Sequence, residues 1–534
     1  MNLVFATASQ LARAIRDKEV SATEVLTAYL EQIAKHNSKI NAIAILDEEK
    51  ARKRAKEADE ALARGESWGI LHGVPITIKD VLETASLLTT AGYPPLKNYI
   101  PSQDATAVAR LKAAGAIVFA KTNPARLAGD YQTNNPLFGR TNNLWDLNRT
   151  VGGSSGGSAS AIAAGFSPLD IGSDVAGSIR HPAHCCGVYG FMPTDRRVPT
   201  TGHIPELPGK SKYIRHLLRI GPLARSVEDL QLCFTLIAGA DPKQPEIPPV
   251  PLNEPAGKKL SNLRIAWTYG YDFLPVSKDT RACIETLINR LTDVGCFLEE
   301  CNPTNFDWEE ALANYSAWAF LELYASTSSV KGLLQGFVVG IKTEFLARTQ
   351  TTFKSGTPLA KKSNLAFPPS LAKYNAVLTD RDRLVTQMDR FIDEWDAWIC
   401  PVSMTPAFPH CDFGESIAVD GVKFPYLLAC GGYTMPLNLT GNPVVVIPIE
   451  QSEEGLPIGV QIVGKRWKDM ELLAIALKLA MRSPLLILLP GKNNVTSLSH
   501  LRSLHSSKQS NFKNFHKTIN IYKSNFSQPL ALNF

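Results

Sequence analysis

Two serines in separate glycine-rich turns are the side chains of this sequence best suited to nucleophilic chemistry. The first turn is Gly-Gly-Ser-Ser-Gly-Gly over residues 152–157, and the second is Gly-Ser-Asp-Val-Ala-Gly-Ser over 172–178. Glycine adopts backbone angles that other residues avoid, so a serine directly after a glycine, as Ser178 is, can be presented at a tight turn. Consecutive N–H groups in such a turn can converge on one point, as an oxyanion hole requires. Here they belong to Val175, Ala176, Gly177 and Ser178.

The first turn also has two alternative interpretations, a flexible Gly/Ser linker and a phosphate-binding loop. The chain returns at once to Ala-Ile-Ala-Ala over 161–164, an ordered core pattern that argues against a linker. Neither G-x-x-x-x-G-K-[ST] nor G-x-G-x-x-G is present, which argues against a phosphate loop. The small residues continue into a helical pattern, so a loop and a helix N-terminus with free N–H groups meet here.

A serine needs a base before it can attack an amide carbonyl, and the sequence offers two kinds. Three histidines, His72, His181 and His184, lie near the turns or upstream of them. The other base is Lys79, which follows the apolar run Val-Pro-Ile-Thr-Ile over 74–78. Burial would lower the pKa of this lysine, and a neutral amine can accept a proton. Spacing alone leaves the choice open, because Lys79 could equally emerge at a strand end and pair with Asp80 in solvent.

A G-x-S-x-G match over 153–157 makes Ser155, in the first turn, an alternative nucleophile to Ser178. This pattern is typical of the nucleophile elbow of α/β-hydrolases, where the serine works with a histidine. The elbow should follow a clear strand, and residues 147–151 do not form a convincing one. An α/β-hydrolase esterase acting through Ser155 therefore stays as an alternative.

Alternating helical and strand patterns surround these turns. Helical periodicity covers 5–17, 25–36 and 48–64, and Ser21-Ala-Thr-Glu24 is a capping box before the second run. Short apolar runs at 74–78, 116–120, 263–267 and 444–448 are typical of strands. The alternation predicts an α/β fold with a sheet covered by helices. Residues 241–255 are too rich in proline for a helix or central strand and predict an extended connection.

Composition narrows the class of protein. Apolar residues make up 44% and charged residues 20%, as in a globular enzyme with a large core. The nine cysteines contain no C-x-x-C pair, so we expect reduced core cysteines, a cytoplasmic location and no metal site. We expect no signal peptide, because residues 5–17 already have the pattern of a helix that carries charges. The late apolar run 472–489 is interrupted by Lys478, Arg482 and Pro484, so no membrane span is predicted.

The net charge of +6 is concentrated near the C-terminus, where five Lys or Arg and no Asp or Glu follow Asn493. The rest of the chain is close to neutral, which indicates no nucleic-acid partner. Residues 493–534 lack periodicity, so we expect a basic, disordered tail that is dispensable for chemistry. Residues 1–492 are predicted to form one domain.

The two serine turns belong to a longer series of motifs. In chain order these are Gly73-Val-Pro-Ile-Thr-Ile-Lys-Asp80, Lys121-Thr-Asn123, the turns at 152–157 and 172–180, Cys186-Gly-Val-Tyr-Gly190, Tyr433-Thr-Met-Pro-Leu-Asn-Leu-Thr-Gly-Asn-Pro443 and Gly455-Leu-Pro-Ile-Gly-Val-Gln-Ile-Val-Gly464. The series resembles the amidase signature family over roughly residues 5–490, with its core motifs at about 70–240. The resemblance implies a single large α/β/α domain around a mixed, mostly parallel β-sheet.

The resemblance also implies a role for each matching residue. Ser178 matches the nucleophile of a Ser–cis-Ser–Lys triad, Ser154 the bridging serine after a cis peptide bond, and Lys79 the base. Residues 175–178 match the oxyanion hole, and supporting polar positions fall on Ser155, Asp174 and Arg180. The chain departs from the family at four positions, which leaves the substrate class and the fine geometry of the site open. Glycine is common in the family at the positions of Ala176 and Arg196, proline at that of Val151, and lysine at that of Met192.

The resemblance implies hydrolysis of a carboxylic amide through an acyl-enzyme. The bond broken is a C–N bond of a linear amide other than a peptide bond. The expected partner is a small-molecule amide substrate, no metal or organic cofactor is implied, and a homodimer is left open. One alternative is a glutamyl-tRNA amidotransferase A-type subunit, which releases ammonia from glutamine and needs partner subunits. Another is an inactive scaffold, which the presence of all three triad residues disfavours. By analogy, residues 312–367 are expected to line the substrate entrance.

Overall fold

The computed structural model describes residues 1–205, 214–252, 254–255, 257–325 and 370–482. All of these lie in the compact unit formed by Met1–Ile487. The predicted tail at 493–534 and most of the predicted entrance at 312–367 fall outside the described residues, so both stay predictions.

Helices form the N-terminal part of the chain where the periodicity predicts them. They are α1 (Ala8–Arg16), α2 (Ala22–Ile40) and α3 (Glu48–Ala63). The capping box of α2 is present: the Ser21 hydroxyl accepts the N–H of Glu24 at 3.1 Å, and the Glu24 carboxylate accepts the N–H of Ser21 at 2.8 Å. Because this exchange satisfies two backbone donors at the helix start, it fixes where α2 begins.

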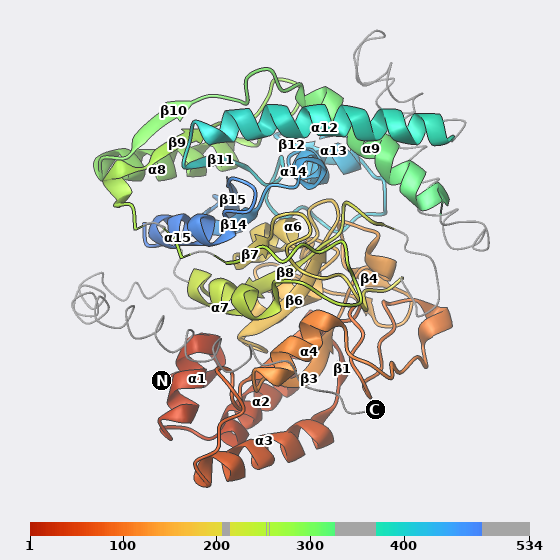
Figure 1. Ribbon diagram of the computed structural model, residues 1–534, viewed down its shortest axis with the longest axis vertical. Coiled ribbons are helices and arrows are strands. Elements are labelled where there is room, and N and C mark those ends of the chain that lie inside the picture. The colour runs from red at the N-terminus through yellow and green to blue at the C-terminus, as the bar shows by residue number, and fades with distance from the viewer. Residues whose placement is uncertain (206–213, 253, 256, 326–369, 483–534) are drawn as a thin grey trace. The chain divides into compact units, whose positions relative to one another are not determined.

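Eleven strands among the described residues form one mixed sheet (Figure 1). In spatial order they are β1 (Ile43–Leu46), β3 (Ile117–Thr122), β2 (Pro75–Lys79), β6 (Leu169–Asp174), β8 (Arg219–Ala224), β7 (Tyr189–Met192), β14 (Val444–Gln451), β15 (Pro457–Val463), β11 (Ala397–Pro401), β9 (Arg264–Trp267) and β10 (Phe297–Glu300). The pairs β3–β2, β2–β6, β11–β9 and β9–β10 are parallel. The six remaining pairs are antiparallel. All four predicted strands are confirmed, as β2, β3, β9 and β14.

Helices cover both faces of the sheet, which confirms the predicted α/β/α arrangement. On one face, α6 (Arg180–Cys186) packs closely against Gly190 of β7: a Cβ added to Gly190 would lie 2.9 Å from the Cβ of Ala183. The next residue, Phe191, meets Phe234 of α7 (Val227–Ile237) edge to face at 5.1 Å between ring centroids. Successive strand residues point to opposite faces, so α6 and α7 lie on opposite sides. Helix α5 (Gly156–Ala163) packs with α6, and α15 (Asp469–Ala480) packs with α7.

The remaining described helices complete the layers. They are α4 (Thr106–Ala113), α8 (Lys278–Asp293), α9 (Trp308–Ala325), α12 (Leu371–Asp393), α13 (Tyr426–Gly431) and α14 (Met435–Thr440). Helices α9, α12 and α14 pack together over an aromatic core in which Trp308 and Trp398 meet at 5.7 Å between ring centroids. Among the described helices, none is long and apolar enough to cross a membrane.

Candidate active site

Lys79 lies at the carboxyl end of β2, between the parallel strands β3 and β6. Parallel strands end at the same edge of a sheet, and this edge is where α/β proteins place their sites. The side chain of Lys79 is completely buried. Its Nζ lies 2.7 Å from the Oγ of Ser154 and 3.0 Å from the Oγ of Ser173, which β6 contributes.

Burial lowers the pKa of Lys79 to about 7, although the negative charges of Asp174 and Asp170 act in the opposite direction. The cause is the loss of water around an ammonium group, which disfavours its charged form. Among the described residues, no carboxylate forms an ion pair with Lys79. Near neutral pH a large share of this lysine is therefore an uncharged amine that can accept a proton.

Ser154 lies in the loop that enters α5, and the peptide bond between Gly153 and Ser154 is cis, as the resemblance implies. The Ser154 carbonyl accepts the N–H of Ala125 at 3.1 Å. The neighbouring Ser155 donates its N–H to the carbonyl of Ser178 at 3.1 Å. The two serine turns, more than twenty residues apart in the chain, are thus joined directly by the backbone.

Ser178 lies in the turn between the end of β6 at Asp174 and the start of α6 at Arg180. The residue is buried, with 8% of its surface exposed. The positive φ of this turn, +121°, falls on Gly177, where an added Cβ would lie 2.5 Å from the Oγ1 of Thr434. Ala176, which replaces the family's usual glycine, has no positive φ, so its methyl group is tolerated.

The N–H groups of this turn have different partners. The N–H of Gly177 donates to the Oδ1 of Asp174 at 2.7 Å. The N–H groups of Val175, Ala176 and Ser178 have no acceptor among the described residues. Three of the four predicted oxyanion donors are therefore available for a ligand, and the fourth holds the turn together.

Hydroxyl groups from remote segments hold the carbonyls of the same turn. The hydroxyl of Tyr131 donates to the Ala176 carbonyl at 2.6 Å, and that of Thr434 donates to the same oxygen at 2.5 Å. The hydroxyl of Tyr315, on α9, donates to the Val175 carbonyl at 3.1 Å. With these carbonyls held, the backbone of the turn has a fixed orientation.

A buried ion pair supports the turn from beneath. Arg180 donates from Nε and Nη2 to Asp174 at 3.1 and 3.0 Å, and both side chains are completely buried. Burial by itself would raise the pKa of Asp174, but the Arg180 charge and the hydrogen bonds to the carboxylate hold it at about 2. Asn438 also donates to this carboxylate, at 3.0 Å. Asp174 is therefore ionised throughout the neutral range and anchors the turn.

The structure brings none of the three candidate histidines to a serine hydroxyl. Burial lowers the pKa of His181 to about 3, and its Nδ1 has no hydrogen-bond partner among the described residues. Backbone groups at Gly459 and Thr405 occupy both ring nitrogens of His184. His72 is likewise held by backbone groups. The hydroxyl of Ser155 donates to the Ser173 carbonyl at 3.3 Å, so the esterase alternative lacks its base.

Several residues of the site were not predicted. Ser173 precedes Asp174 in the second turn, and the alternation of β6 could have indicated it. Tyr131, Tyr315 and Thr434 come from segments up to 258 residues away from the turn they contact. No local pattern marks the two tyrosines, whereas Thr434 lies in one of the quoted motifs.

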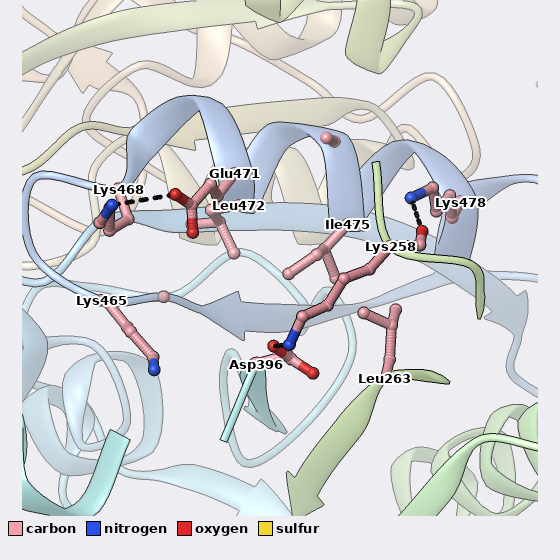
Figure 2. A pocket seen from close by; sticks show the side chains of 11 residues that line it. Lys258, Leu263, Asp396, Lys465, Lys468, Glu471, Leu472, Ile475 and Lys478 are labelled. Atoms are coloured by element: carbon pink, nitrogen blue, oxygen red, sulfur yellow. Dashed lines mark hydrogen bonds and ion pairs between the residues drawn. The ribbon is translucent and has the colours of Figure 1, made fainter. Parts of the chain in front are cut away.

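A surface pocket between α15 and the strand β9 is separate from these residues (Figure 2). Among its lining residues, Lys258 pairs with Asp396 at 2.5 Å, and Lys468 pairs with Glu471 at the start of α15 at 3.0 Å. None of the predicted site residues lines this pocket. Among the described residues, no group of three or more His, Cys, Asp or Glu side chains could hold a metal ion.

The buried Lys79 contacts a hydroxyl of each serine turn, and the esterase alternative has no histidine base, so the site differs from that of an α/β-hydrolase. The family model described as Amidase matches residues 24–473, and the chain belongs to this amidase signature family.

Among the relatives is the A-type subunit of the glutamyl-tRNA(Gln) amidotransferase from Geobacillus thermodenitrificans (strain NG80-2). It is 33% identical over 486 residues, which cover 89% of this chain and 97% of the relative. The structure of 6-aminohexanoate cyclic dimer hydrolase with its substrate is 25% identical, has a TM-score of 0.72 and matches 91% of this chain and 99% of its own. A bacterial aryl acylamidase, 23% identical, has a TM-score of 0.76 over 92% of this chain and 99% of its own, and shows the shared fold.

Proposed function

We propose that this protein hydrolyses a carboxylic amide to an acid and an amine or ammonia through an acyl-enzyme on Ser178. The observation that carries the proposal is the buried Nζ of Lys79, 2.7 Å from the hydroxyl of Ser154. Burial keeps much of this lysine neutral near pH 7, and a neutral amine next to a hydroxyl is a general base. Family membership supports amide chemistry in general.

In the proposed reaction, Lys79 accepts a proton from Ser154 while Ser154 accepts one from Ser178. The Ser178 oxygen attacks the amide carbonyl, and the N–H groups of Val175, Ala176 and Ser178 stabilise the oxyanion. The proton returns along the same chain to the leaving nitrogen, and the C–N bond breaks. Water then attacks the acyl-enzyme with the same groups acting in the same order, which releases the acid.

One hydrogen bond of this relay has to form during the reaction. Among the described residues, the hydroxyls of Ser154 and Ser178 are not bonded to each other. The Ser178 hydroxyl therefore has to turn toward Ser154, and such bonds often tighten only when substrate binds.

The test is turnover of a panel of aryl, short-chain and fatty-acyl amides by the purified chain, measured as released amine or ammonia. We expect at least one class to be hydrolysed by the wild type and not by the Ser178→Ala variant. Hydrolysis of the panel that survives Ser178→Ala would contradict the proposal.

A second candidate is the role of an amidotransferase subunit, which the relatives favour because several share that name. Such a subunit would release ammonia from glutamine and pass it to partner subunits. The two candidates differ in what the isolated chain does: an independent amidase hydrolyses small amides alone, whereas a subunit needs its partners. Comparing glutamine with the amide panel in the absence of other proteins separates them.

We also propose a cytoplasmic location. No disulfide joins any of the nine cysteines, all of which lie in the described part of the chain. Thiols in a reducing compartment stay in this form. Recovery of the protein in the cytosolic fraction after cell fractionation would support this location. Recovery in the membrane fraction or the culture medium would contradict it.

A further inference from the structure

Tyr315 is a buried side chain of α9 that reaches the nucleophile turn from a distant part of the chain. Its hydroxyl donates to the carbonyl oxygen of Val175, 140 positions earlier, at 3.1 Å. In the part of the chain that the structure describes, no other group donates to this oxygen. Burial and the negative charge of Asp174 raise the pKa of Tyr315, so the hydroxyl keeps its proton and stays a donor.

The planarity of the peptide bond links this carbonyl to one donor of the proposed oxyanion hole. The Val175 carbonyl and the Ala176 N–H belong to the same peptide group, which is trans, so the two point in opposite directions. A hydroxyl that holds the carbonyl therefore also sets the direction of the N–H. This N–H has no acceptor among the described residues, so Tyr315 orients a donor that is available to a ligand.

The next peptide group of the turn provides a comparison. Its carbonyl, on Ala176, accepts two hydroxyls, that of Tyr131 at 2.6 Å and that of Thr434 at 2.5 Å. Its N–H, on Gly177, donates within the turn at 2.7 Å. Two side chains therefore hold a peptide group whose N–H is already bonded, whereas Tyr315 holds one whose N–H is available.

The other available donors of the turn are oriented by different groups. The N–H of Ser178 shares its peptide group with the Gly177 carbonyl, which accepts the N–H of His181 at 2.7 Å. The first N–H of the turn shares its peptide group with the Asp174 carbonyl, which accepts the side-chain amide of Asn438 at 3.4 Å. Loss of the Tyr315 hydroxyl should therefore loosen one donor and leave the others in place.

Helix α9 is itself held in place, so Tyr315 can act as a rigid anchor. Trp308, at the start of α9, donates from Nε1 to the Gly432 carbonyl at 2.9 Å. Asn314, next to Tyr315, donates to the Val377 carbonyl of α12 at 3.1 Å, and α12 packs along α9 (Figure 1). These contacts fix the position from which the hydroxyl reaches the turn.

We propose that Tyr315 is a positioning residue of the oxyanion hole, which aims the N–H of Ala176 at the oxygen of the tetrahedral intermediate. It acts through the peptide group between Val175 and Ala176. The inference rests on the proposed function, because the intermediate forms on Ser178. Oriented donors contribute most where charge develops in the transition state, so loss of this hydroxyl should lower kcat and leave KM nearly unchanged.

The test measures kcat, KM and inhibition in Tyr315→Phe, which removes one hydroxyl and keeps the ring. The substrates are aryl, short-chain and fatty-acyl 4-nitroanilides, and the inhibitors are trifluoromethyl ketones with phenyl, methyl and undecyl groups that match these acyl groups. In the ketone adduct, the Ser178 oxygen bonds to the carbonyl carbon and the electron pair of the C=O bond moves to its oxygen. The serine proton passes through Ser154 to Lys79. The adduct oxygen lies where the oxyanion forms, so the Ki of the ketone reports on the oxyanion hole.

Tyr315→Phe should lower kcat about tenfold, less than the roughly 10²–10³-fold cost of removing an oxyanion donor, because the N–H is loosened and not removed. The Ki of the matching ketone should rise by the same factor, and KM should change less than about twofold. Unchanged kcat and Ki would overturn the inference. A rise in KM with an unchanged Ki would show a merely structural role and would overturn it as well.

Two variants that remove the same chemical group are the controls. Tyr131→Phe should lower kcat less than Tyr315→Phe does, because Thr434 still holds the Ala176 carbonyl. Tyr29→Phe removes a buried hydroxyl on α2, bonded to the Leu3 carbonyl at 3.5 Å, and should leave kcat and Ki unchanged. A loss in Tyr131→Phe that equals or exceeds the loss in Tyr315→Phe would contradict the assignment.

The outcomes separate this inference from the proposed function. If Ser178→Ala is inactive while Tyr315→Phe keeps the wild-type kcat and Ki, only the inference fails. If anilide hydrolysis survives Ser178→Ala, or the wild type hydrolyses none of the anilides, the proposed function fails and the inference fails with it. Parallel losses in kcat and Ki in Tyr315→Phe support both.

Discussion

Acidifying the solution from pH 8 to pH 6 should lower kcat/KM about tenfold, because Lys79 must be neutral to act as a base. Burial lowers the pKa of this lysine to about 7. Its neutral form therefore falls from about nine-tenths at pH 8 to about one-tenth at pH 6. The sign follows from the chemistry: the active form is present above the pKa and is lost as the pH falls through it. A lysine with its ordinary pKa would instead give a rate that still rises tenfold per unit at pH 9.

Removing a nearby charge tests the same assignment. The carboxylate of Asp170 raises the pKa of Lys79, so Asp170→Asn should move the acidic limb of kcat/KM to lower pH. The assay is the initial rate of anilide hydrolysis between pH 5.5 and 9, on a substrate without groups that titrate there. A limb that stays in place or moves to higher pH would contradict this electrostatic coupling.

Removing the base should abolish the limb. Lys79→Ala should lose at least about 10²-fold in rate, the low end for one general base, and its remaining rate should vary little with pH. Lys121→Met is the matched control, because Lys121 is another buried lysine on the adjacent strand, bonded to Leu82 and two threonines instead of the serines. The reasoning is refuted if Lys79→Ala keeps most of the activity while a variant at His181 or His184 is inactive.

Three further changes test the supporting structure. Arg180→Met should cost about 3–5 kcal/mol in the free energy of unfolding, measured with urea, because it leaves the buried Asp174 carboxylate without its partner; a loss below about 1 kcal/mol would contradict this. Gly177→Ala should lower both kcat and the melting temperature, because the new Cβ would lie 2.5 Å from the hydroxyl oxygen of Thr434. Gly455→Ala is the control: this glycine also has a positive φ but has open space around it, so the substitution should lower only the melting temperature. Truncation after Lys492 should change activity and melting temperature little; a drop of more than about 4 °C, or roughly 1 kcal/mol, would show that the tail contacts the domain.

The sequence predicts those parts of the site that depend on local pattern. The β-branched run before Lys79 indicates a buried strand, and the structure has β2 there with every residue buried. Spacing alone did not decide between Lys79 and a histidine, because a separation of 75 positions in the chain does not predict that Lys79 and Ser154 are in contact. The resemblance of the ordered motifs supplied that pairing, and the 2.7 Å contact agrees with it.

The rest depends on long-range packing. The order of the strands places β2 beside β6 and leaves an antiparallel centre, and strand pairing of this kind is not encoded in any single run. Tyr131 and Tyr315 reach the nucleophile turn from distant segments, so their hydroxyls could not be foreseen. The departure at Ala176 left the fine geometry of the turn open, and the structure places the positive φ on Gly177, which follows it.

The most direct test of the central claim is to identify the serine that reacts. A fluorophosphonate probe should label the protein covalently, and peptide mass spectrometry should place the label on Ser178. The label should be lost in Ser178→Ala and reduced in Lys79→Ala, because the nucleophile then lacks its base. A label on Ser155, or one that persists in Ser178→Ala, would contradict the account.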